Sequence, residues 1–250
     1  MAVIGIMSAM HEELSAVLAA MPDEQVVHVA GREFGVGQWH GHDVVAVLSR
    51  IGKVAAATTA TALIERFKVD ALVFTGAAGG LAPDAQVGDV VVASALLQHD
   101  MDASPLFPKH EVPLYGRSRF DTDASLSKAL AAAADQVLSD PAQHLGAQAM
   151  ADFHLLSPRV HQGLIVSGDR FVSTTAESQA LQRSLPDALA VEMEGAAVAQ
   201  VCLDYGVPFA AVRTISDRAD DDAHIDFKRF IRDVASRYSL AILSQWLMHR

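Results

Sequence analysis

Short apolar runs alternate with amphipathic segments along most of this chain. The apolar runs that predict buried strands are 2–8, 71–75, 87–97, 162–167, 188–192 and 208–216. The segments that predict helices are 10–20, about 53–67, 123–138, 176–184, 193–205 and 225–248. Alternating strands and helices are typical of α/β proteins, in which helices cover both faces of a sheet. We therefore expect a single-domain, three-layer α/β/α sandwich with a mixed central sheet over residues 1–250.

Several segments depart from this alternation. Three short runs predict a strand meander, at 26–30, 33–39 and 43–49. The glycine-rich stretch 76–80 predicts a turn, in which the backbone can approach a ligand closely. Residues 98–122 contain three prolines and predict a long loop, and a loop of that length in a compact domain is usually functional or disordered. Residues 139–160 are polar and predict a loop with a helical turn.

Composition excludes several classes of protein. Hydrophobic residues make up 51% of the chain, which argues against disorder, and the net charge of -11 argues against a nucleic-acid partner. The chain has one cysteine, Cys202, so an internal disulfide is excluded and a reducing compartment is favoured. No apolar run approaches the roughly 18 residues of a membrane span, and the apolar start of the sequence is too short, and lacks the basic lead, for us to expect a signal peptide. We expect a cytoplasmic protein without a membrane partner.

Residues with useful chemistry follow the predicted strands at their carboxyl ends, where ligands bind in open α/β sheets. In chain order these residues are Glu13, the glycines of 76–80, Phe171, Glu192, Glu194, Arg213 and Asp217. The 11 histidines are scattered and none pairs with a cysteine, so the sequence predicts neither a metal site nor a cofactor. Arg213 lies inside an apolar strand and requires a buried partner or a ligand.

The segment Glu192-Met193-Glu194 places two carboxylates where a strand meets the start of a helix. We expect the positive end of the helix dipole to hold Glu194 ionised. An ionised carboxylate can accept parallel hydrogen bonds from two neighbouring hydroxyls, such as those of a ribose. The alternative interpretation is that Glu194 only supports its own helix. Asp217, taken alone, is equally consistent with an ordinary loop residue.

Seven motifs spread along the chain resemble those of one family. They lie at 4–13, 51–55, 75–81, 87–91, 166–171, 191–194 and 212–217. In these motifs the chain is similar to the 5'-methylthioadenosine/S-adenosylhomocysteine nucleosidases of bacteria and plants, within the nucleoside phosphorylase family. Only about 139–160 lacks a clear counterpart. The resemblance implies the same three-layer fold and a hydrolase that releases adenine from 5'-methylthioadenosine, and from S-adenosylhomocysteine, without a cofactor.

The resemblance also implies a role for each matching residue. Asp217 would protonate N7 of adenine with Ser216 orienting its carboxyl, and Glu13 would activate a water that Arg213 helps to hold. The residues implied to bind substrate are Glu194 and Met193 at the ribose, Phe171 and the Val172 backbone at adenine, Met10, Ile51 and Phe227 at the 5' group, and Ala77 and Gly79 of the glycine-rich stretch. Ala77 replaces a serine of many bacterial members and removes one hydroxyl near the water.

A homodimer is a further implication of the resemblance. In the family, a neighbouring subunit closes the 5' pocket with the loop that matches about 103–114 here. The segment 98–107 is more like the plant form, which hints at a preference for the smaller methylthio substrate.

The chemistry of ribosyl C–N cleavage fits two carboxyl groups with different tasks, as in glycoside hydrolysis. An Asp217 that donates a proton at neutral pH needs a pKa well above the ordinary value of about 3.9. Three alternatives stay open at this point. They are phosphorolysis of the same nucleoside, hydrolysis of a related nucleoside such as aminofutalosine, and nucleoside binding or storage without catalysis. Phosphorolysis is disfavoured because Met7–Glu13 lacks the family's Gly-x-Pro-x-Arg turn and places acids there.

Overall fold

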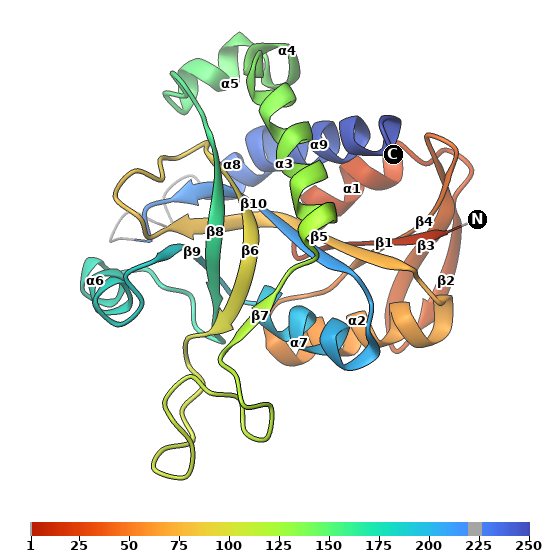
Figure 1. The fold of residues 1–250 in the computed structure, drawn as a ribbon. Coiled ribbons are helices and arrows are strands. Elements are labelled where there is room, and N and C mark those ends of the chain that lie inside the picture. Colours follow the sequence, from red (N-terminus) through yellow and green to blue (C-terminus); the bar gives the residue numbers. More distant parts are fainter. Residues whose placement is uncertain (1, 220–226) are drawn as a thin grey trace.

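The computed structural model describes residues 2–219 and 227–250 (Figure 1). The strands are β1 (Val3–Ser8), β2 (Gln25–Val29), β3 (Arg32–Trp39), β4 (His42–Leu48), β5 (Ala71–Gly80), β6 (Val90–Gln98), β7 (Arg119–Asp121), β8 (Val160–Ser167), β9 (Ala188–Glu192) and β10 (Phe209–Asp217). The helices are α1 (His11–Ala19), α2 (Lys53–Phe67), α3 (Ala124–Leu138), α4 (Pro141–Leu145), α5 (Ala147–Asp152), α6 (Thr175–Ser184), α7 (Gly195–Tyr205), α8 (Phe227–Phe230) and α9 (Ser236–Met248). No helix in these residues is long and apolar enough to cross a membrane.

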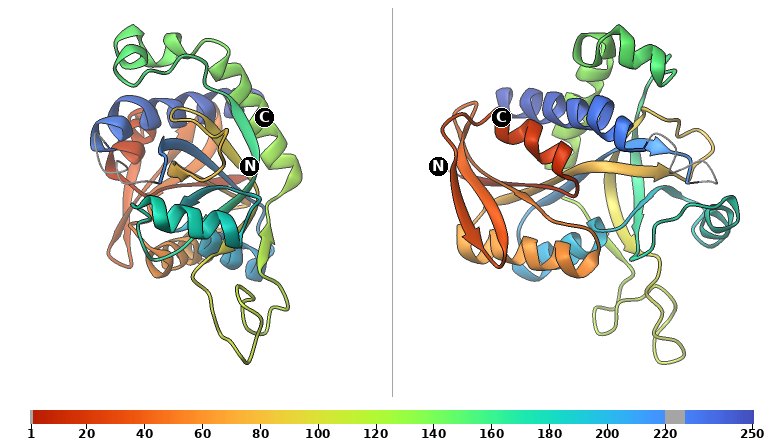
Figure 2. Two further views of the ribbon diagram at one scale, coloured as in Figure 1. Left: turned by 90° about the vertical axis from the view of Figure 1, so that its left-hand side faces the viewer. Right: turned by 180° about the vertical axis from the view of Figure 1, so that it is seen from behind.

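The strands described form one mixed sheet, as the sequence predicts. Its order is β10-β6-β8-β9-β5-β1-β4-β3-β2, with β7 beside β6. β10 also pairs with β5, so that β5, β10, β6, β8 and β9 close into a ring. The remaining strands extend from β5 as the predicted meander, which lies at one end of the molecule (Figure 2).

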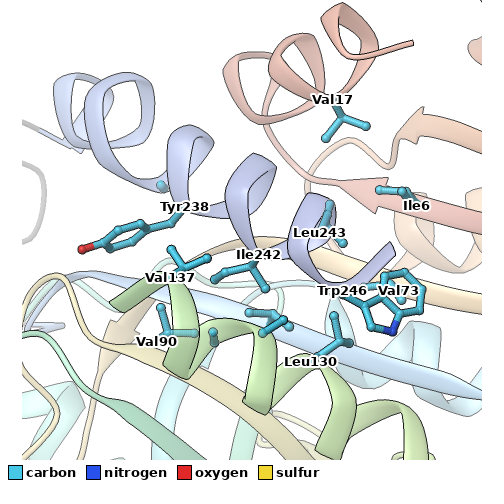
Figure 3. Close-up of a cluster of buried hydrophobic side chains, with 14 of the residues drawn as sticks. Ile6, Val17, Val73, Val90, Leu130, Val137, Tyr238, Ile242, Leu243 and Trp246 are labelled. Atoms are coloured by element: carbon cyan, nitrogen blue, oxygen red, sulfur yellow. The ribbon is translucent and has the colours of Figure 1, made fainter. Parts of the chain in front are cut away.

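Helices cover both faces of the sheet, which confirms the three-layer arrangement. α1, α3 and α9 pack together on one face, and α2 packs against α7 on the other (Figure 1). Figure 3 shows the first of these layers, where Val17, Leu130 and Ile242 from three helices meet strand residues such as Ile6. The apolar positions that predicted these helices therefore fill the two layers beside the sheet, because each helix has one face to bury.

The segment 76–80 is not a turn, contrary to the expectation from its glycines. β5 continues through it to Gly80, and each glycine lies close to another part of the chain. A Cβ at Gly76 would lie 3.3 Å from the Glu13 carboxylate, and a Cβ at Gly80 would lie 3.1 Å from Ile215. The glycines provide space for neighbouring side chains rather than a change of chain direction.

Other boundaries also differ from the sequence prediction. Strand β6 begins at Val90, because Gly88 adopts a positive φ of 90° and Asp89 joins the preceding turn. The region 139–160 contains two short helices, α4 and α5, instead of one helical turn. The closing helix contains a π-helical turn, Ile231–Ala235, and the predicted start at 225 lies outside the described residues. Single π-helical turns occur frequently at functional sites.

Candidate functional site

One cavity brings together residues from seven separate parts of the described chain. Its polar wall contains Glu13 from α1, Glu194 before α7, and Ser216 and Asp217 at the end of β10. Ala77 and Gly79 of β5, with Met193, complete the inner wall. The three carboxylates that the sequence analysis singled out therefore share one cavity, although 204 positions separate the first from the last.

This meeting point depends on the topology of the sheet. β9 runs antiparallel to β5, and the two strands pair only near their carboxyl ends, where Gly79 faces Val191 and Gly80 faces Ala190. β10 runs parallel to β5, which places Asp217 beside Gly79. The carboxyl ends of β5, β9 and β10 therefore meet at one place, although these strands do not form one edge of a parallel sheet.

Apolar side chains line much of the rest of the cavity. Five of them, Met10, Ile51, Phe171, Val172 and Phe227, were predicted as substrate-binding residues. The rings of Phe171 and Phe227 meet edge to face at 6.0 Å between centroids. Phe171 is 44% exposed and Ile51 is 59% exposed, so both lie at the mouth. Such exposure of large apolar groups is typical of a surface that a ligand or a partner covers.

Glu13 is completely buried at the inner end of the cavity. The Met10 N–H donates to Glu13 Oε2 at 3.2 Å, whereas Oε1 has no hydrogen-bond partner among the described residues. Burial raises the pKa of the Glu13 carboxyl from 4.5 to about 7, and the Met10 N–H and the charge of Arg213 act in the opposite direction. A carboxyl with this pKa exchanges protons near neutral pH, as a general base requires.

Asp217 is held at the cavity wall by its neighbours. The Ser216 hydroxyl donates to Asp217 Oδ2 at 2.7 Å, and the Ala219 N–H donates to Oδ1 at 2.8 Å. A β-bulge between Ile215 and Asp217 interrupts the normal alternation, which explains why Ser216 and Asp217 both line the cavity. A Cβ at Gly79 would lie 3.0 Å from Asp217 Oδ1, so glycine is needed there for close approach.

Glu194 is also buried, but its environment differs from the expected one. The Gly52 N–H donates to Glu194 Oε1 at 2.8 Å. The first free amides of α7 donate to Glu192 instead, with Gly195 N–H 2.8 Å from Glu192 Oε2. Burial, and then the charge of Glu192, raise the pKa of Glu194 to about 7. The expectation that the α7 dipole keeps Glu194 ionised is therefore wrong, because Glu192 occupies that position.

Arg213 is the one predicted site residue that does not line the cavity. It is 1% exposed, its Nη2 donates to Glu192 Oε2 at 2.8 Å, and its Nη1 donates to the Phe74 carbonyl at 2.9 Å. Its guanidinium also lies over the Phe74 ring, 4.2 Å from the centroid. The buried partner required by an arginine inside a strand is thus Glu192.

Sequence reasoning did not assign a role to two polar residues at the cavity, namely Glu192, which lines it, and Ser167, which contacts Glu192. The Ser167 hydroxyl donates to Glu192 Oε1 and accepts the Ala196 N–H at 2.8 Å. Glu192 was noticed as one of two carboxylates but was not assigned to the site, although Arg213 in an apolar strand indicated a buried anion. Ser167 ends a strand, which was the available signal. In the described part of the chain no cluster of His, Cys, Asp or Glu is arranged to hold a metal ion.

Comparison with known proteins agrees with this geometry. The family model described as the Phosphorylase superfamily matches residues 3–245. The fold is similar to S-adenosylhomocysteine nucleosidase from Streptococcus pyogenes in complex with 5-methylthiotubericidin, at 35% identity and a TM-score of 0.85, covering 99% of this chain and 97% of that chain.

Two further solved structures cover 100% of both chains. One is 5'-methylthioadenosine/S-adenosylhomocysteine nucleosidase from Neisseria meningitidis in complex with methylthio-immucillin-A, at 31% identity and a TM-score of 0.86. The other is a futalosine hydrolase mutant of Helicobacter pylori, at 31% identity and a TM-score of 0.84. The similarity therefore extends over whole chains and includes relatives named for different nucleosides.

Proposed function

Because the chain belongs to the phosphorylase superfamily, we propose that it hydrolyses the N-ribosidic bond of 5'-methylthioadenosine and S-adenosylhomocysteine to adenine and the thioribose. The observation that carries this proposal is the meeting of Glu13, Glu194 and Asp217 in one cavity with an aromatic mouth. Relatives at 31–35% identity are named as nucleosidases acting on these substrates, which supports the assignment.

Asp217 acts as the general acid in this proposal. Protonation of the purine at N7 turns it into a better leaving group as the ribosyl carbon develops oxocarbenium character. The Ser216 and Ala219 hydrogen bonds keep the Asp217 carboxyl directed at one position on the cavity wall. General acid catalysis by a positioned group typically contributes about 10²–10⁴-fold to the rate.

Glu13 acts as the general base for the attacking water. Its Oε1 is available to accept a proton, since no described residue donates to it. Glu194 binds the ribose 2' and 3' hydroxyls, with Met193 packed against the sugar. Ala77 offers no hydroxyl beside the water, so the water is placed by Glu13 and the surrounding backbone.

In this proposal the apolar part of the cavity binds both adenine and the 5' group. Phe171 stacks on adenine and the Val172 backbone binds the adenine edge, while Met10, Ile51 and Phe227 surround the thioalkyl group. Apolar walls of this kind suit a sulfur substituent, because burial of apolar surface contributes about 25 cal/mol per Å².

Release of adenine in phosphate-free buffer tests the proposal. The wild-type protein should release adenine from 5'-methylthioadenosine without phosphate, measured by absorbance or chromatography. A strict requirement for phosphate would favour phosphorolysis, and binding without any release would favour a storage protein. Phosphorolysis is disfavoured because the cavity-lining residues described here bring four carboxylates and one cation, Arg170, which is paired with Glu177.

The relative named as a futalosine hydrolase mutant supports a second candidate, hydrolysis of aminofutalosine or a similar nucleoside. A panel containing 5'-methylthioadenosine, S-adenosylhomocysteine and aminofutalosine separates the two by kcat/KM. The proposed function predicts the highest value for 5'-methylthioadenosine or S-adenosylhomocysteine.

We also propose a cytoplasmic homodimer in which the partner's 103–114 loop covers the 5' side of the cavity. This loop extends away from the body (Figure 2), and its Leu106 and Leu114 are 84% and 92% exposed. Val54, three residues after Ile51, is 78% exposed and adds to the apolar surface. Light scattering after gel filtration should show a dimer, and Leu114→Asp should weaken it and raise KM. A monomeric wild-type enzyme with full activity would refute this assembly.

A further inference from the structure

Glu192 is a buried carboxylate, 7% exposed, that is surrounded by hydrogen-bond donors. Ser167 Oγ and Gly195 N–H donate to Oε1, the latter at 2.9 Å. Arg213 Nη2 and Gly195 N–H donate to Oε2, each at 2.8 Å, and Glu194 N–H donates to it at 3.2 Å. A set made of donors suits a carboxylate anion, and the positive end of α7 favours the same charge.

These donors connect the parts of the fold that surround the cavity. Ser167 ends β8 and also accepts the Ala196 N–H of α7, while Arg213 in β10 reaches the Phe74 carbonyl of β5. Glu192 ends β9 and joins all of them. The carboxylate therefore fixes the junction between β9 and α7, on which Glu194 lies.

Glu194 has the opposite environment, although Met193 alone separates it from Glu192. It accepts a hydrogen bond from the uncharged Gly52 N–H and lies next to a carboxylate of the same sign. Burial and the charge of Glu192 raise the pKa of Glu194 to about 7. Neighbouring carboxyl groups in such different surroundings commonly have different roles in one site.

We propose that Glu192 is a positioning residue of the sugar-binding site, which acts on the nucleoside through Glu194. This inference rests on the proposed function, because it requires Glu194 to bind the ribose hydroxyls. Glu192 has two effects: its hydrogen bond to the Glu194 N–H sets the direction of that residue, and its charge delays ionisation of the Glu194 carboxyl. The sugar is then bound most tightly when Glu194 is ionised, above about pH 7.

Other charged or titratable groups around this pair must be considered. Arg213 of β10 lowers the pKa of Glu194, but the charge of Glu192 has the larger effect. Glu13 of α1 and Asp217 of β10 line the same cavity. The charge of Glu192 also acts on His99, which follows β6. Adenine, a ligand without a sugar, makes no contact with the sugar site. The pH dependence of its binding therefore reports these other groups and not Glu194.

The test compares two ligands in wild type and in Glu192→Gln. Calorimetry from pH 5.5 to 8.5 measures the affinity for adenine and for 5-methylthiotubericidin, the compound bound by the streptococcal relative. In wild type the preference for the nucleoside analogue over adenine should rise through about pH 7. In Glu192→Gln this rise should move to lower pH, and the preference at pH 8 should fall by about tenfold through lost hydrogen bonding at the junction.

Controls distinguish positioning from general destabilisation. Glu194→Gln should abolish the pH-dependent preference, and adenine affinity should stay within about twofold of wild type in both variants, because adenine does not reach the sugar site. The inference is overturned if folded Glu192→Gln protein prefers the nucleoside analogue over adenine as strongly as wild type does, with the same pH midpoint of that preference. Loss of thermal stability without a displaced midpoint would show a purely structural role and also overturns it.

Glu192→Gln leaves Arg213 buried without its anion and can fail to fold for that reason. The double variant Glu192→Gln/Arg213→Met removes both charges and is the replacement in that case. The pH midpoint of its preference for the nucleoside analogue should still move to lower pH, since the charge of Glu192 affects the pKa of Glu194 more than the charge of Arg213 does. A wild-type protein that does not bind the analogue refutes the proposed function, whereas binding with unchanged variants refutes only the role of Glu192.

Discussion

The stability of a Glu13→Gln variant relative to wild type should increase as the pH rises, while its activity should be much lower. The Glu13 carboxyl is completely buried and its pKa in the folded protein is about 7, against 4.5 in the unfolded chain. An elevated carboxyl pKa means that the unfolded chain releases the proton first. Folding is therefore penalised once the pH exceeds 4.5, and the penalty reaches its full value above about pH 7.

The size of the effect follows from the two pKa values. Raising the carboxyl pKa from 4.5 to about 7 lowers the free energy of unfolding by about 3 kcal/mol at pH 8 and by about 1 kcal/mol at pH 5. Glu13→Gln removes this penalty but introduces a buried amide, whose cost does not depend on pH. The difference in unfolding free energy between variant and wild type should thus become more favourable to the variant by about 2 kcal/mol from pH 5 to pH 8.

Urea unfolding at several pH values measures this difference directly. Glu12→Gln, one residue earlier and outside the cavity, is the control for loss of one negative charge from α1. Adenine release by Glu13→Gln should fall by about 10²–10⁴-fold over the same pH range. A stability difference that is constant from pH 5 to pH 8 would refute the reasoning, since it would show that burial does not raise the pKa of Glu13.

Three further predictions concern the same cavity. Asp217→Asn should keep the hydrogen bond from Ala219 N–H but lower kcat for adenine release by about 10²–10⁴-fold; unchanged kcat would exclude Asp217 as the acid. The wild-type kcat/KM should rise with pH through about 7 as Glu13 loses its proton, and a profile that is flat between pH 5.5 and 8 would contradict this role. Gly79→Ala should lower stability by about 1–3 kcal/mol in urea unfolding, because its Cβ would lie 2.9 Å from the Ala219 Cβ; a neutral substitution would show that the β10 end is free to move.

Local pattern was sufficient for most elements of the fold. The apolar runs of the chain have lengths and periods that differ between strands and helices, so β1, β8 and β10 and the helices α2, α3 and α7 were predicted close to their observed bounds. Glycines misled the prediction at β5, since a glycine-rich segment has the same composition whether it turns or provides space inside a strand.

The sequence by itself also determined which residues take part in the site. Polar groups at strand ends and an arginine in an apolar strand are costly unless they are partnered, and this cost is visible without coordinates. Residues 13, 194 and 217 were selected by their position after predicted strands and by the resemblance to the nucleosidases, and all three line one cavity.

Tertiary structure alone decided the partners of these groups and the raised pKa values of Glu13 and Glu194. The antiparallel crossing of β9 and β5 places Glu192 against Arg213 and under the first amides of α7, so Glu192 and not Glu194 receives the donors. Hydrogen-bond partners distant in sequence and the degree of burial set a carboxyl pKa, and neither is encoded in a local pattern. The sequence thus specified which carboxyl groups are present, whereas the fold determined their hydrogen-bond partners and raised the pKa values of Glu13 and Glu194.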